Sequence, residues 1–184
     1  RDAVFAGPEF DKMFEDAVLD EAVFSSMIEG AFTTREAAAG LIRRQKAPAN
    51  KSEQMVKNNY DALTYVLSHL DERITEGTLL AIARIVTRNA GEAEVSGYRD
   101  RGVVVAGSGE VVYTPPKPEA VPGMMRALVA FLEESELHPV LKACIAHFYF
   151  VYIYPFVDGN GRTARALSYM LLLQSGYDFF RYFS

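Results

Sequence analysis

The sequence predicts one mainly helical domain, of the all-α class, that carries a single short β-hairpin. Apolar residues recur at helical spacing over most of the 184 residues. The stretch 103–113 differs, because it has the valine-rich, glycine-interrupted composition of two short strands. A chain of this length suits one domain with a sizeable core. We therefore expect residues 1–184 to form a single domain.

The first helix is expected from about residue 10 to residue 29. Apolar side chains recur there at helical spacing, namely Phe14, Val18 and Ala22. Gly30 stands where helices often end in a left-handed residue. The motif Thr-Thr-Arg-Glu at 33–36 is typical of a capping box that opens a second, short helix.

The same periodicity predicts four more helices, over 52–70, 76–87, 119–133 and 139–153. The last is the most apolar, and we expect it to be the most buried, through Leu141, Cys144, Ile145, Phe148 and Tyr152. Cys144 is the only cysteine, so it cannot form an internal disulfide. We expect a buried thiol, which suits a reducing compartment such as the cytoplasm. His147 is expected to be a hydrogen-bonded core histidine.

The predicted hairpin pairs two runs of valine across the turn Gly107-Ser108-Gly109. Its strands comprise Val103, Val104 and Val105 on one side and Val111, Val112 and Tyr113 on the other. Two isolated strands are marginally stable in water, so the hairpin must lean on the helices. Its open edge can add a strand from a partner peptide, although a purely structural arm would have the same composition.

The charge and hydropathy of the chain exclude two classes of partner. A net charge of −5 lacks the basic footprint that nucleic-acid binding requires. The most apolar stretch, 143–157, is too short to span a bilayer and is interrupted by His147. No signal peptide is visible. Because the chain begins with Arg1 and stops just after a new aromatic cluster begins, we expect a fragment of a longer protein.

The most informative stretch is a glycine-rich loop that leads into an apolar helix and spans about 154–175. Asp158 precedes Gly159-Asn160-Gly161, and Arg162 and Arg165 follow. A turn of this kind directs backbone N–H groups and the positive end of the helix dipole to one side. A carboxylate suits Mg²⁺, and arginine forks suit phosphate. The order predicts a Mg²⁺-nucleotide or polyphosphate site. The alternative is a plain turn with solvated arginines.

This segment resembles the signature of the Fic family, His-x-Phe-x-Asp/Glu-Gly-Asn-Gly-Arg-x-x-Arg. The matching positions are Phe156, Asp158, Gly159, Asn160, Gly161, Arg162 and Arg165, whereas Tyr154 stands at the family's catalytic histidine. The segments Ser96-Gly97-Tyr98-Arg99 and Tyr113-Thr114-Pro115-Pro116 are also similar to the family. The resemblance covers about residues 25–176 and implies a helical bundle whose hairpin is a flap that aligns a target protein.

A second motif, Ser25-x-x-x-Glu29-Gly30, resembles the inhibitory helix of the same family. By that resemblance, Glu29 would pair with Arg165 and prevent productive docking of the ATP γ-phosphate. Charge alone agrees, because a carboxylate and a phosphate would compete for one guanidinium.

The activity that the resemblance implies is transfer of AMP from ATP to a hydroxyl group of a target protein. Asp158 would hold Mg²⁺, the Gly159–Gly161 turn would bind phosphate, and Arg162 and Arg165 would hold the outer phosphates. The histidine that takes the hydroxyl proton is replaced by Tyr154, whose reference pKa of about 10 makes it a poor base. Three hypotheses follow: an impaired adenylyltransferase, a degenerate nucleotide-binding and protein-interaction module, and a structural helical domain. The sequence does not specify the target or the oligomeric state.

Overall fold

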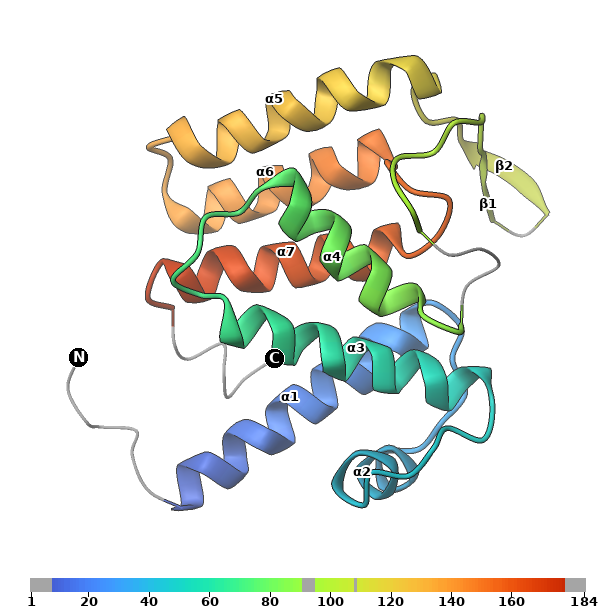
Figure 1. Cartoon of the computed structure of the whole chain (residues 1–184), viewed down its shortest axis with the longest axis vertical. Coiled ribbons are helices and arrows are strands. Elements are labelled where there is room, and N and C mark those ends of the chain that lie inside the picture. Colours follow the sequence, from blue (N-terminus) through green and yellow to red (C-terminus); the bar gives the residue numbers. More distant parts are fainter. Residues whose placement is uncertain (1–7, 91–94, 108, 178–184) are drawn as a thin grey trace.

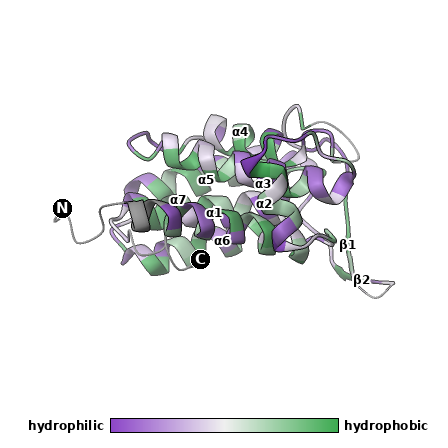
Figure 2. Cartoon of the chain, turned by 90° about the horizontal axis from the view of Figure 1, so that it is seen from below, coloured by the Kyte–Doolittle hydropathy of each residue, from purple (hydrophilic) through white to green (hydrophobic). Residues whose placement is uncertain are grey.

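The structure, a computed structural model, describes residues 8–90, 95–107 and 109–177. In this part of the chain seven α-helices form a bundle, and one two-stranded antiparallel hairpin projects from one end of it (Figures 1 and 2). The elements are α1 (Pro8–Ile28), α2 (Arg35–Arg43), α3 (Lys51–Ser68), α4 (Glu76–Thr87), β1 (Val105–Gly107), β2 (Glu110–Tyr113), α5 (Val121–Glu134), α6 (Pro139–Ile153) and α7 (Asn160–Gln174).

Helix positions follow from local signals in the sequence, and the predicted all-α bundle with one hairpin is confirmed. Thr34, Asn50 and Thr75 cap α2, α3 and α4, each accepting a hydrogen bond from the backbone N–H three residues later. The cap of α2 is therefore Thr34 rather than the preceding threonine that the capping box favoured. Gly30 and Gly176 follow α1 and α7 with φ values of +86° and +83°, as expected for residues just past helix ends.

Helix α7 lies at the centre of the bundle and is buried on two sides (Figure 1). One side packs in a cluster with α4, α5 and α6, through residues that include Leu167, Met125 and Phe150. The other side packs in a cluster with α1, α3 and α4, through residues that include Met170 and Val66. Because α7 belongs to both clusters, the position of the loop that precedes it is fixed by nearly the whole bundle.

The predicted core face of α6 is wrong. Leu141, Phe148 and Tyr152 are 55%, 68% and 41% exposed, and Ile145 and Cys144 are exposed as well, so Cys144 is not a buried thiol. The buried face consists of Ala143, Ala146, Phe150 and Ile153. The helix is apolar all round, so periodicity could not distinguish its two faces.

The hairpin is shorter at its entrance than the sequence predicts. Strand β1 begins at Val105, and Val103 and Val104 lie before it. Val105 pairs with Tyr113, the last residue of β2. If the antiparallel register continued, Val103 would lie opposite Pro115. Proline has no backbone N–H to donate, so the ladder ends before this pair. Of the predicted turn, the central Ser108 lies outside the described residues.

Within the described ranges, no helix has both the length and the hydrophobicity that crossing a bilayer requires. Buried apolar side chains form the core, whereas α6 and the hairpin leave several large apolar side chains exposed.

Candidate active site

The glycine-rich loop connects α6 to α7 and is closed by its own asparagine. The Asn160 side chain accepts a hydrogen bond from the Phe156 N–H at 3.0 Å and donates one to the Phe156 carbonyl at 2.9 Å. Gly159, with φ +77°, lies directly against α4, because a Cβ at this position would come 2.7 Å from the Thr87 Cγ2 atom. Both the backbone angle and the close approach require glycine here.

The first turn of α7 presents backbone donors at this loop. The N–H of Gly159 is taken by the Asp158 carboxylate at 2.6 Å. The next three N–H groups, of Asn160, Gly161 and Arg162, have no carbonyl four residues earlier within the helix. Together with the helix dipole they favour an anion.

The carboxylate of Glu29, the residue that follows α1, lies at this helix start. Glu29 Oε1 accepts a hydrogen bond from Arg165 Nη2 at 2.8 Å. Ser25 holds the same guanidinium, because its hydroxyl accepts from Arg165 Nε at 2.7 Å and its carbonyl from Nη2 at 2.9 Å. A Cβ on Gly161 would come 2.3 Å from Glu29 Oε1, which places the carboxylate on the α7 backbone. The pairing of Glu29 with Arg165, expected from the resemblance of the sequence to the Fic family, is present.

The two arginines of the signature occupy different environments. Arg165 is 20% exposed and lies on the surface shared with α1. Arg162 is 3% exposed, donates to the Val86 carbonyl of α4 at 2.5 Å, and lies 3.5 Å from Asp158. Its buried Nε has no hydrogen-bond partner among the described residues, and burial lowers the pKa of the guanidinium. Arg165 is thus the more accessible of the two, and an outer-phosphate role for Arg162 stays a prediction.

Tyr154 stands at the C-terminal end of α6 in the left-handed conformation, with φ +51°. Its side chain is half-buried. Burial raises the pKa of the phenol above its ordinary value, and the nearby charges of Glu29 and Asp158 raise it further, against a smaller lowering by Asn160. The hydroxyl therefore remains protonated at neutral pH and is a poor proton acceptor.

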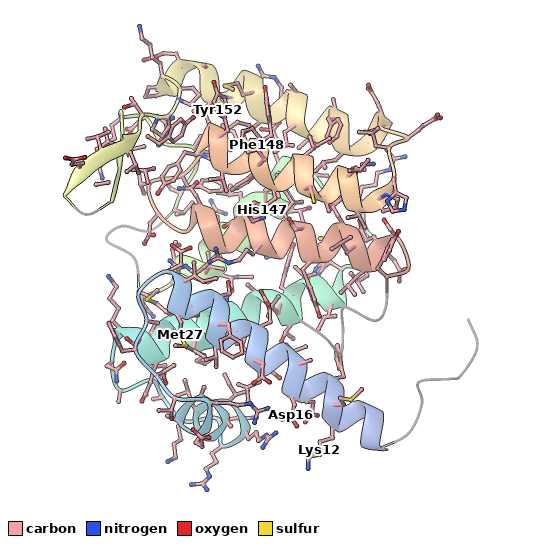
Figure 3. All side chains as sticks on the ribbon, turned by 180° about the vertical axis from the view of Figure 1, so that it is seen from behind. Lys12, Asp16, Met27, His147, Phe148 and Tyr152 are labelled. Atoms are coloured by element: carbon pink, nitrogen blue, oxygen red, sulfur yellow. The ribbon has the colours of Figure 1, made fainter. Side chains whose placement is uncertain are left out.

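His147 does not replace the missing base. Its Nδ1 lies 3.2 Å from the Ser168 hydroxyl of α7. Burial and the charge of Arg165 lower its pKa. The histidine is hydrogen-bonded, as expected, but it is only partly buried and is not the core residue that the sequence predicted. Figure 3 shows His147 in the middle of α6, whereas Tyr152 lies close to the hairpin end.

A magnesium ion fits this site only as a companion of phosphate. The described residues contain no group of three or more histidine, cysteine or acidic side chains that could hold a metal by themselves. Asp158 is 34% exposed, and its Oδ1 accepts the Gly159 N–H. A single carboxylate together with phosphate oxygens is the usual protein share of a Mg²⁺ site, so the donor set is compatible with the ion.

Arg99, which the sequence did not single out as a site residue, is buried next to the backbone of Tyr154. Its side chain is 4% exposed and donates to the carbonyl of Tyr154 at 2.8 Å. Asp100 follows it directly in the sequence, but the acceptors of its guanidinium in the structure are main-chain carbonyls. The only sequence signal was the similarity of the segment 96–99 to the Fic family.

Comparisons with known proteins agree with this geometry. A protein named protein adenylyltransferase Fic, from Nematostella vectensis, is 32% identical over 190 residues, which is 96% of this chain and 43% of the relative. The chain thus spans less than half the length of that relative.

Two solved structures share the fold. A Fic domain-containing signalling protein from Bacteroides thetaiotaomicron has a TM-score of 0.80 at 27% identity, over 92% of this chain and 68% of that one. The structure of IbpAFic2 covalently tethered to Cdc42 has a TM-score of 0.55 at 19% identity, over 88% of this chain and 48% of that one. A sequence model of the Fic/DOC family matches residues 73–172. The chain, with its glycine-rich loop, central α7 and projecting hairpin, therefore belongs to the Fic/DOC family.

Proposed function

We propose that this domain is a protein adenylyltransferase domain that is restrained by Glu29 and impaired at Tyr154. The observation that carries the proposal is the Glu29 carboxylate on the first turn of α7, held by Arg165 at 2.8 Å. A carboxylate already lies on the guanidinium of Arg165, beside the N-terminal turn of α7, and a phosphate of ATP is the substrate that would compete for this position.

In the proposed reaction, a hydroxyl oxygen of the target attacks the α-phosphorus of ATP. A new oxygen–phosphorus bond forms, the bond from the α-phosphorus to the bridging oxygen breaks, and pyrophosphate leaves. The hydroxyl proton must pass to a base. The α7 N-terminus and Arg165 stabilise negative charge that develops on the phosphates. Asp158 would hold Mg²⁺, which neutralises phosphate charge when it is bound.

Proton removal is the weak step. At position 154 a histidine would accept the hydroxyl proton, but the Tyr154 phenol, with its raised pKa, is protonated at neutral pH. General-base catalysis contributes about 10²- to 10⁴-fold to a rate. The second candidate function is therefore a nucleotide-binding module that interacts with a protein partner without transferring AMP. The raised pKa of Tyr154 is the observation that favours it.

The partner we propose is a target protein that docks along the hairpin edge. The two-stranded sheet has open edges, and Val104, Val111 and Val112 are 57%, 59% and 65% exposed. Extended segments pair with such edges through main-chain hydrogen bonds. The IbpAFic2 structure, in which a Fic domain is tethered to Cdc42, supports a protein as the substrate class. A cytoplasmic location, which would supply ATP, stays a prediction.

The test is transfer of label from α-labelled ATP to the protein itself. Two chains are compared, Glu29→Gly with Tyr154 kept and Glu29→Gly with Tyr154→His. We expect about 10²- to 10⁴-fold faster transfer in the histidine chain. Equal transfer in both would show that Tyr154 supports catalysis. Binding of ATP without label transfer in either chain would favour the binding module, and absence of ATP binding would refute both functions.

A further inference from the structure

Arg99 connects three parts of the chain through one buried guanidinium. It lies between α4 and the hairpin and is 4% exposed. Nε donates to the Tyr154 carbonyl at 2.8 Å, Nη1 to the Arg101 carbonyl at 3.1 Å, and Nη2 to the Pro116 carbonyl at 2.5 Å. Nη2 also lies 3.4 Å from the Ile153 carbonyl. The backbone adds a fifth link, from the Arg99 N–H to the carbonyl of residue 155 at 2.9 Å.

The four side-chain acceptors belong to two kinds of structure. Ile153 and Tyr154 end α6, where carbonyl groups have no intrahelical partner and the helix dipole is negative. Arg101 precedes β1 by four residues, and Pro116 follows β2 by three, so they mark the entrance and the exit of the hairpin. Arg99 therefore joins both legs of the hairpin to the residue at the position of the catalytic base.

This arrangement suits arginine and no other cation. The guanidinium is planar and presents its N–H groups in a fixed fork, so the directions of its acceptors are fixed relative to one another. A lysine ammonium is a point charge on a flexible stem and does not impose that geometry. Burial lowers the pKa of Arg99 because the charged group loses hydration, and the carbonyl groups named above are the hydrogen-bond acceptors that replace water.

A separate and more exposed link also joins the hairpin to α6. The Tyr113 hydroxyl donates to the Tyr152 carbonyl at 2.7 Å, and the two rings lie 5.9 Å apart. This link holds only β2, whereas Arg99 holds both legs. The hairpin is otherwise short, with three residues in β1 and four in β2, so its own ladder cannot set its direction.

We propose that Arg99 is a positioning residue for AMP transfer: it fixes the hairpin, on which the target's main chain docks, relative to residue 154 and the start of α7. This role rests on the proposed function. A hydroxyl displaced by about 1 Å can lose about 10²-fold in rate. One guanidinium that holds both the docking surface and the base position would prevent such a displacement.

The chain offers a matched control for a purely structural role. Arg84 of α4 also donates to main-chain carbonyls, to Val95 at 3.0 Å from Nε and to Ser96 at 2.8 Å from Nη2. These acceptors belong neither to the hairpin nor to α6. Arg84→Lys and Arg99→Lys therefore make the same chemical change, but only the second loosens the connection between the hairpin and residue 154.

The first measurement is the distance distribution between two spin labels on the 184-residue chain. One label is attached to the native, exposed Cys144 on α6, and the other to Glu110→Cys on β2. We expect Arg99→Lys to broaden the distribution at least twofold and Arg84→Lys to leave it unchanged. The thermal unfolding midpoint of each variant is measured in parallel. An unchanged distribution in a folded Arg99→Lys chain, or equal broadening in both variants, would overturn the proposal.

The second measurement is label transfer in the Glu29→Gly, Tyr154→His background. At saturating ATP we expect Arg99→Lys to slow transfer at least tenfold without changing the Kd for ATP, and Arg84→Lys to transfer at the background rate. A parallel loss of ATP affinity, or transfer at the background rate with Arg99→Lys, would overturn the positioning role. If the background transfers no label, the proposed function fails, whereas the spin-label result still decides whether Arg99 sets the direction of the hairpin.

Discussion

Removing the Glu29 carboxylate should tighten ATP binding by an amount that the structure allows to be calculated. Glu29 and Arg165 are bonded at 2.8 Å, with side chains 33% and 20% exposed. A hydrogen bond between charged, partly buried groups contributes about 1.5 to 3 kcal/mol. ATP must displace this contact before a phosphate can bind Arg165. Since each 1.36 kcal/mol is a factor of ten, we expect Glu29→Gly to lower the Kd for ATP by about 10- to 150-fold.

The assay is calorimetric titration of Mg²⁺ and a non-transferable ATP analogue into three variants and the unchanged chain. Glu29→Gln keeps the size of the side chain but loses its charge. Its Kd for the ATP analogue should therefore lie between those of the unchanged chain and Glu29→Gly. Glu36→Gln removes an exposed acid from the first turn of α2 and serves as the matched control. The gain in affinity should shrink at high salt, because ionic contacts of partly exposed groups are screened. A Kd for Glu29→Gly within twofold of the unchanged chain would refute the reasoning.

Four further outcomes are expected. Asp158→Asn, which keeps an acceptor for the next N–H, should remove most of the Mg²⁺ dependence of ATP binding in titrations with and without EDTA; equal dependence would place the metal elsewhere. Gly176 has φ +83°, and a Cβ added there would meet nothing within 4 Å, so Gly176→Ala should lower the free energy of unfolding by about 1–2 kcal/mol through backbone strain alone. Gly159→Ala should lower the free energy of unfolding, measured with urea, by about 1–3 kcal/mol more than Gly176→Ala does, because its Cβ would also clash with α4. Finally, the lowered pKa of His147 means that unfolding takes up a proton, so stability should fall as the pH drops below about 6.5, and His147→Gln should flatten that decline.

The sequence by itself determined the elements whose signals are local. Helix caps depend on residues three apart, and the bounds of α4 and α6 agree with the periodic patterns to the residue. The loop 158–165 could be recognised because its acid, glycines and arginines lie within eight positions of the chain. Even the pairing of Glu29 with Arg165 was predicted, but that prediction came from resemblance to a family and not from periodicity.

Only the tertiary structure decided which side of an apolar helix is buried and which arginine is accessible. The faces of α6 are equally apolar, and α7 packs against the one that carries small alanines, leaving Phe148 68% exposed. Arg162 and Arg165 have the same chemistry, yet the Val86 carbonyl of α4 holds the first inside the bundle and α1 meets the second at its surface. Arg99 could not be found because its acceptors are main-chain carbonyls, which every residue possesses. Their convergence on one guanidinium exists only once helix and hairpin have folded together.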